Sequence, residues 1–156
     1  MRRHLVLAPL LLLAAAAPAP AAAAEPVWAT VNYCDSASSP NAVGVRANLP
    51  GRDARAGMYA RFTAEWLDPR SNAWKQVDGV PSSPWVSAGS GRQLSAQVGW
   101  TFDFDPPPPG AGFQIRGVAE LEWRQGGSAG RRETLVTSGG IGADIGETSL
   151  ATCALR

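Results

Sequence analysis

The sequence predicts an all-β fold in which two antiparallel sheets of roughly seven or eight strands pack as a sandwich. Apolar and polar side chains alternate with a period of two along most of residues 27–155, which is typical of strands with one buried face. Glycine, proline, serine and asparagine separate the alternating runs, as turns require. Two cysteines stand near the two ends of this region, where a disulfide between them would close the domain.

The alternating runs follow one another without an internal repeat. The strands are expected at residues 27–34, 43–49, 58–66, 74–77, 94–102, 113–124, 133–137 and 148–155. Residues 68–72 have the composition of a turn, and the Pro106–Pro109 run predicts an extended polyproline connection, because proline cannot lie inside a sheet.

Residues 53–67 leave a choice between strand and helix. Met58, Phe62 and Trp66 are spaced as on one face of a helix, for which Asp53 would serve as N-cap. The alternation continues through Glu65 into the turn, and this favours a strand.

Residues 1–24 have the three-part layout of a secretory signal peptide: a basic start, an apolar stretch and small residues before Glu25. The apolar stretch is shorter than the ~20 residues that a membrane-spanning helix needs, so an anchor is the weaker interpretation. We therefore expect a secreted, extracellular protein with no membrane insertion after cleavage. Residues 25–156 then form a single domain, whose length is typical of one.

Cys34 and Cys153 are the only cysteines, and an isolated pair in an exported chain predicts a disulfide. The alternative is a reactive thiol. It is disfavoured, because the chain has no Cys-x-x-Cys motif and no histidine to activate a thiolate after export.

The strand pattern between Met58 and Thr137 resembles a fibronectin type III or immunoglobulin-like sandwich. A long strand is followed by a turn, the short run Trp74–Val77, a further strand, a proline-bearing corner and a long strand that begins at Phe113. The pattern departs from these families, since it lacks a Cys–Trp–Cys core and carries Phe113 where a tyrosine is expected. The chain also resembles small exported bacterial proteins, a likeness that implies no activity.

Charge and histidine content exclude several functions. The 14 basic residues fall to 12 when Arg2 and Arg3 leave with the signal peptide, against 13 acidic residues, so no positive surface for nucleic acid is expected. His4 is the only histidine and leaves as well. Catalysis by Ser-His-Asp or Cys-His groups and histidine-based zinc sites are therefore excluded, and we expect no metal and no cofactor.

Two carboxylate pairs remain as candidates for glycoside hydrolysis. Asp103 and Asp105 share one strand face, as do Glu120 and Glu122. Such pairs on strand exteriors are more often solvated. Gly139–Ile145 matches the calcium-binding pattern Gly-Gly-x-Gly-x-Asp-x once, but that site needs stacked repeats, so a glycine-rich loop is expected instead.

The six tryptophans divide into two groups. Trp66, Trp100 and Trp123 fall on the faces assigned to the core. Trp28, Trp74 and Trp85 are less determined, and as exposed rings they could stack on sugars.

Three hypotheses follow. The leading one is a non-enzymatic immunoglobulin-like domain that binds a cell-surface partner or belongs to the cell envelope. The second is a carbohydrate-binding module that binds polysaccharide through Trp28, Trp74 or Trp85. The third is a carboxylate-based glycoside hydrolase.

Overall fold

The chain forms strands and turns throughout the part that the computed structural model describes, residues 25–140 and 148–156. Nine strands lie in these ranges: β1 Trp28–Ser36, β2 Ser39–Pro50, β3 Gly57–Asp68, β4 Ala73–Gln76, β5 Val86–Ser90, β6 Ser95–Asp103, β7 Phe113–Gln125, β8 Ser128–Val136 and β9 Cys153–Leu155. No helix among the described residues is long and apolar enough to span a membrane.

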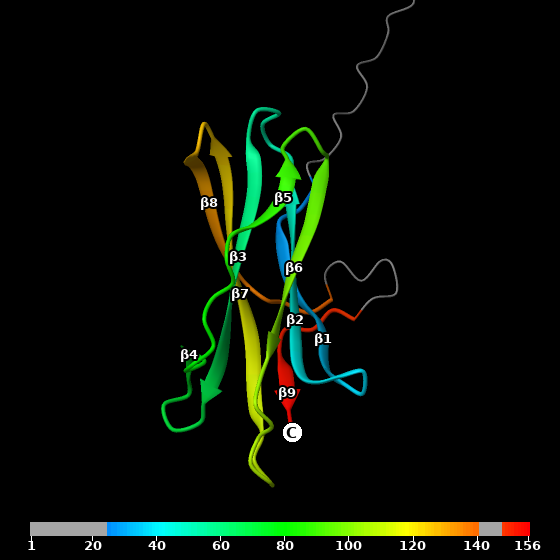
Figure 1. The fold of residues 1–156 in the computed structure, drawn as a ribbon, viewed down its shortest axis with the longest axis vertical. Helices are drawn as coiled ribbons and strands as arrows, with labels where there is room; N and C mark the ends of the chain where they lie inside the picture. The colour runs from blue at the N-terminus through cyan, green and yellow to red at the C-terminus, as the bar shows by residue number, and fades with distance from the viewer. Residues whose placement is uncertain (1–24, 141–147) are drawn as a thin grey trace, which may run out of the picture.

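The strands pair in two antiparallel sheets that face one another (Figure 1). The smaller sheet has the order β1-β2-β6. The larger sheet has the order β4-β3-β7-β8, with β5 added beside β3 and β9 beside β7. The predicted all-β fold with two antiparallel sheets is therefore confirmed, with nine described strands in place of the seven or eight expected.

The period-two alternation places the core between the sheets. In β3 the buried positions are every second residue from Met58 to Ala64. They lie beside the buried positions of β7 in the same sheet and face those of β2 in the other sheet. The largest fully buried side chains include Phe62, Leu49, Met58 and Leu121. Burial of such side chains contributes roughly 1.5–3 kcal/mol each, so the alternation in the sequence accounts for most of the driving force for sheet packing.

Residues 57–68 form a strand and not a helix, which confirms the preferred interpretation of this segment. Pairing with β7 is continuous from Gly57↔Arg124 to Trp66↔Ile115. Asp53 lies in the preceding turn, where its carboxylate accepts a hydrogen bond from the Arg55 N–H. The pairing with β7, which is distant in the sequence, therefore selects the strand period of two over the helical spacing of Met58, Phe62 and Trp66.

Several strands differ from the expectation. β2 begins at Ser39 and not at residue 43, and β9 covers only Cys153–Leu155 of the strand expected at 148–155, where the preceding residues make a single bridge from Leu150 to Val31. β5 is short and made of small residues, of which only Val86 and Ala88 are partly buried, and the sequence did not predict it. β8 begins at Ser128, because Gly126 and Gly127 both have positive φ and form a two-residue hairpin turn that pairs Gln125 with Ser128.

The predicted core position of Trp100 is wrong. Trp100 lies opposite Val45 on the inner face of the smaller sheet, but the side chain is 37% exposed. β6 is an edge strand of its sheet, so no further strand covers this ring. Trp66 packs against the core while partly buried, and Trp123 is buried as expected.

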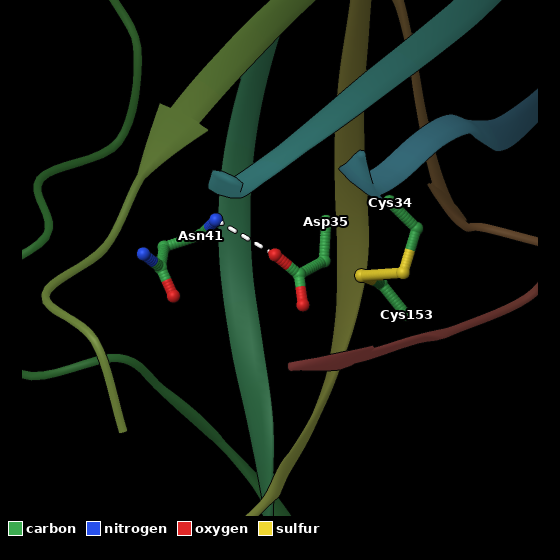
Figure 2. Close-up of a disulfide and its surroundings, with 4 residues drawn as sticks. All are labelled: Cys34, Asp35, Asn41 and Cys153. Atoms are coloured by element: carbon green, nitrogen blue, oxygen red, sulfur yellow. Dashed lines mark hydrogen bonds between the residues drawn. A yellow bond between two sulfur atoms is a disulfide. The ribbon is translucent and has the colours of Figure 1, made fainter. Parts of the chain in front are cut away.

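The disulfide between Cys34 and Cys153 is confirmed and joins the two sheets. Figure 2 shows it linking β1 of the smaller sheet to β9 of the larger one, with the Cα atoms 5.3 Å apart across a separation of 119 residues. Beside it, Asp35 has a positive φ and accepts a hydrogen bond from the Asn41 N–H, which fixes the β1–β2 turn.

Two predicted segments lie outside the described residues. These are the signal peptide, residues 1–24, and most of the glycine-rich segment Gly139–Ile145, of which residues 141–145 are not described.

Candidate functional site

The outer face of the larger sheet carries alternating arginines, glutamates and aromatic rings. Strand alternation turns the odd-numbered residues of β3 and the even-numbered residues of β7 to this side. We call this surface the arginine–aromatic face; it comprises Tyr59, Arg61, Glu65, Trp74, Trp85, Arg116, Glu120, Glu122, Arg124 and Arg132.

Ion pairs occupy every glutamate of this face. Arg61 contacts Glu120 at 2.6 Å and Arg116 contacts Glu65 at 2.6 Å. These carboxylates bind arginine across the β3–β7 pairing, where residues directly opposite one another are in reach. The predicted pair Glu120 and Glu122 therefore shares a face as expected, but both carboxylates are occupied.

Glu122 is the most buried carboxylate of the arginine–aromatic face, at 5% exposed. It contacts Arg124 at 2.6 Å and Arg132 at 2.7 Å. Burial raises the pKa of the Glu122 carboxyl, but the hydrogen bonds and positive charges of Arg124 and Arg132 outweigh burial and hold the pKa below its ordinary value of 4.5. Glu122 is thus a structural anion within the sheet.

We expect acid to destabilise the protein through Glu122. Because its pKa is lower in the folded state, the unfolded state binds more protons, and the stabilisation that is complete above pH 4.5 is lost as pH falls. Glu122→Gln should lower the free energy of unfolding by about 1–3 kcal/mol at neutral pH. In the variant, the free energy of unfolding should fall less steeply as the pH is lowered. Urea unfolding at a series of pH values measures both effects. Glu120→Gln, in the more exposed pair with Arg61, is the control and should cost less.

The predicted sugar-stacking tryptophans lie against guanidinium groups. Arg116 lies 4.4 Å from the ring centroid of Trp74, and Arg124 lies 4.5 Å from that of Trp85. Arg61 also lies over Trp85, at 5.1 Å. The arrangement is a cation–π contact, which fixes each half-buried ring on the sheet.

Trp28 stands apart from the other two rings. It belongs to β1 of the smaller sheet and is 7% exposed, whereas Trp74 and Trp85 share the arginine–aromatic face. The sugar-stacking role of the three tryptophans stays a prediction.

A polar hollow of about 380 Å³ lies on the arginine–aromatic face over β7 and β8. Three arginines and three glutamates line it in balanced number, together with the ring of Trp85; the lining is Arg61, Trp85, Glu120, Leu121, Glu122, Arg124, Gly127, Ala129, Arg132, Glu133 and Thr134. The three lining arginines bind Glu120 and Glu122, and Glu133 binds Arg52 and Arg131 beside the hollow, so no charge of the lining is without an ion-pair partner.

A second and larger cavity, of about 550 Å³, opens between the two sheets near the C-terminus. We call it the terminal cleft. It is bordered by the ends of β3, β6 and β9, the start of β7 and the connection after β4. Its lining is Trp66, Val77, Asp78, Gly79, Val80, Asp103, Phe104, Asp105, Phe113, Ile115 and Leu155.

The wall of the terminal cleft is aromatic and aliphatic. Trp66 and Phe113 meet edge to face with their ring centroids 6.1 Å apart, an arrangement that aromatic pairs prefer. Phe113 begins β7 and pairs with Leu155 of β9. The disulfide at Cys153 therefore holds the strand that completes this wall.

Three aspartates stand around this wall. Asp103 and Asp105, the predicted pair, both line the terminal cleft, and Asp78 joins them from the connection between β4 and β5. All three are exposed, and within the described residues none forms an ion pair or a side-chain hydrogen bond. The described part of the chain contains no group of three or more acidic, histidine or cysteine residues placed to hold a metal ion.

Sequence reasoning missed Asp78 because it lies outside every alternating run. The available signal was the Asp78-Gly79 turn, in which Gly79 has a positive φ of 75°. A turn at this point brings a loop acid over the end of the sheet.

The fold and the site define a class: a disulfide-closed all-β protein of two antiparallel sheets with an aromatic, acid-bordered cleft between them. A scan against models of known protein families matches none of them. A search of curated proteins finds no match.

Proposed function

We propose that the protein is a secreted, non-enzymatic binding domain with an immunoglobulin-like sandwich, and that it binds a cationic ligand with an apolar body in the terminal cleft. The class includes an amine or a guanidinium group on an aliphatic stem, such as a lysine or arginine side chain of a cell-surface partner. The observation that carries the proposal is the combination of an aromatic wall with three aspartates that lack a cation among the described residues.

The strand order supports the immunoglobulin-like part of the proposal. Immunoglobulin domains place strands A, B and E in one sheet and C, F and G in the other. Here the first, second and sixth strands form one sheet, and the third, seventh and eighth lie side by side in the other. β4, β5 and β9 are additions to the larger sheet.

The leader-like start of the chain and the disulfide support secretion. A disulfide persists in an oxidising compartment, and residues 1–24 have the layout that directs export. A secreted protein binds its ligand outside the cell.

The chemistry of the cleft favours an organic cation. Its lining contains three carboxylates, no lysine and no arginine, whereas every glutamate of the arginine–aromatic face is already paired. An ammonium or guanidinium group bound to a carboxylate makes a charge-assisted hydrogen bond, and its apolar stem can cover Trp66 and Phe113. Each half of such a ligand has a matching surface in the cleft.

The same geometry favours binding over hydrolysis. The three aspartates of the cleft are exposed, whereas a carboxylic acid that serves as general acid is held in buried, apolar surroundings. The buried Glu122 is fully engaged by two arginines. We therefore assign no catalytic role to either carboxylate pair.

Titration with three probes of equal stem length tests the proposal. Hexylamine should bind more tightly than 1-hexanol by on the order of tenfold, because a hydrogen bond to a charged group contributes about 1.5–3 kcal/mol. Hexanoate should bind more weakly than either. Isothermal titration calorimetry measures all three affinities.

Variants assign the binding to the cleft. Asp103→Asn should remove much of the preference for hexylamine over hexanol, and Phe113→Ala should weaken both. Glu25→Gln, which removes an exposed carboxylate elsewhere, should leave both affinities unchanged. Equal binding of the three probes, or a hexylamine affinity that Asp103→Asn and Phe113→Ala leave intact, would refute the proposal.

A further inference from the structure

Most strand edges in the described part of the chain are blocked against further pairing. β8 carries Arg131, Arg132 and Glu133, and β4 is four residues long and contains Lys75. β5 pairs with β3 through a register shift and is five residues long, and β9 has three residues. Charges, shortness and irregular register are the devices by which proteins prevent edge-to-edge association.

The outer edge of β1 is covered in a different way. Val31 and Leu150 exchange backbone hydrogen bonds, and the Ser138 N–H donates to the Ala29 carbonyl. β1 also contains two register shifts against β2. A further strand cannot pair along it.

β6 has none of these protections. Its nine residues pair with β2 in unbroken register from Pro50↔Ser95 to Ala42↔Asp103. It contains no proline, lysine or arginine, and its one charge is at the end, on Asp103. Among the described strands, β6 is the one edge that is long, regular in register and uncharged except at its last residue, and such an edge is a template for pairing.

The connection between β4 and β5 does not cover the β6 edge with backbone hydrogen bonds. The N–H groups of Val77 and Ser83 in this connection donate to Ala64 and Phe62 of β3, in the larger sheet. No backbone hydrogen bond of the described residues joins the outer edge of β6 to another segment. Every second residue of an edge strand directs its N–H and C=O groups outward, so these groups are open to a partner strand.

Apolar side chains are also exposed along this edge. Trp100 is 37% exposed although it lies on the inner face of the sheet, and Leu94, just before the strand, is 83% exposed. A strand added beside β6 would cover the Trp100 ring. The exposed tryptophan that contradicted the core prediction is thus a second observation at the same edge.

We propose that β6 pairs with β6 of a second copy of this chain, antiparallel and centred on Gly99, so that the smaller sheets of the two copies become one continuous sheet. The geometry of a twofold axis at Gly99 places Val98 opposite Trp100 and Gln97 opposite Thr101 of the other copy. This inference is independent of the ligand proposed for the terminal cleft.

The strand is complementary to itself in this register. The inner face brings alanine, valine, tryptophan and phenylalanine together, since Ala96 would lie opposite Phe102 and Val98 opposite Trp100. The outer face brings polar residues together, with Ser95 opposite Asp103. No position places like charges opposite one another, and aromatic–β-branched pairs of this kind stabilise antiparallel sheets.

Two matched double variants test the pairing. In the proposed register residue 97 of one copy faces residue 101 of the other, so Gln97→Lys with Thr101→Lys sets lysine against lysine. Gln97→Glu with Thr101→Lys changes the same two positions but sets glutamate against lysine. Both variants lose the hydrogen bond that the Tyr33 hydroxyl donates to Thr101. A difference between their dimer dissociation constants therefore reports the effect of the charges alone.

Analytical ultracentrifugation of the purified, oxidised protein over a concentration series gives the readout. We expect a monomer–dimer equilibrium for the natural sequence, a dissociation constant raised on the order of tenfold by the lysine–lysine variant, and a dimer retained by the glutamate–lysine variant. Circular dichroism confirms that each variant is folded.

Three results would overturn the inference. A natural sequence that stays monomeric across the series has no such pairing. If both variants dimerise as strongly as the natural sequence, the interface lies elsewhere. If both lose dimerisation to the same extent, the register centred on Gly99 is excluded.

Discussion

Replacement of Cys34 and Cys153 by serine should lower the free energy of unfolding by about 4–5 kcal/mol, because the disulfide closes a very long loop and restricts the unfolded chain. The bond spans a separation of 119 residues and links β1 to β9 across the sandwich. β9 has only three residues paired with β7, so we expect it to detach when the bond is absent. Loss of Leu155 from its place would also open the terminal cleft.

Urea unfolding of the oxidised protein, the reduced protein and the double-serine variant measures this effect. The reduced protein and the variant should agree, since both lack the covalent link. A loss below about 1 kcal/mol in both would show that the two chain ends are held by packing alone.

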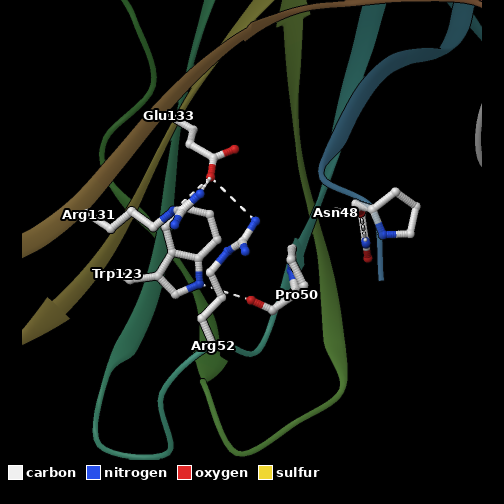
Figure 3. A network of polar contacts seen from close by, with 7 residues as sticks. Asn48, Pro50, Arg52, Trp123, Arg131 and Glu133 are labelled. Carbon is white, nitrogen blue, oxygen red and sulfur yellow. Dashed lines mark hydrogen bonds and ion pairs between the residues drawn. The ribbon is translucent and has the colours of Figure 1, made fainter. Parts of the chain in front are cut away.

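Truncation of Trp123 should have the second largest effect, with Trp123→Ala costing about 3–5 kcal/mol. The ring is 3% exposed, and its Nε1–H donates a 2.9 Å hydrogen bond to the Pro50 carbonyl, joining β7 to the end of β2 (Figure 3). Arg52 and Arg131 lie over the ring at 5.4 Å and 5.9 Å from its centroid, and Glu133 binds both arginines.

Trp123→Phe separates the hydrogen bond from the packing. It keeps an aromatic ring but leaves the Pro50 carbonyl without its partner, and it should cost about 1–3 kcal/mol. Trp74→Ala, which truncates a half-buried ring under Arg116, is the comparison and should cost less than Trp123→Ala. Equal costs at positions 74 and 123 would contradict the assignment of Trp123 to the core.

Most of the fold could be predicted from alternation, because a strand with one buried face has apolar residues at every second position. β3 and β7 are the clearest cases, and their pairing settled the helix–strand ambiguity of residues 53–67. β5 could not be predicted in this way, since its small residues are mostly exposed and its position is set by pairing with β3. Trp100 shows the opposite error: its position on the inner face was right, but an edge strand does not guarantee burial.

The candidate site was less predictable, because the terminal cleft is assembled from segments far apart in the sequence. Asp103 and Asp105 were recognisable as a pair, but their proximity to Trp66, Asp78 and Phe113 depends on how the two sheets end beside one another. The arginines over Trp74 and Trp85 were not anticipated either, since cross-strand neighbours depend on register.

The proposed binding site can be mapped most directly by nuclear magnetic resonance during titration with hexylamine. We predict shifts for the Trp66 indole N–H, for Phe113 and for Val80, all in the lining of the terminal cleft. Shifts confined to Trp85 and Arg124, on the arginine–aromatic face, would contradict the account and move the site to the outer surface of the larger sheet.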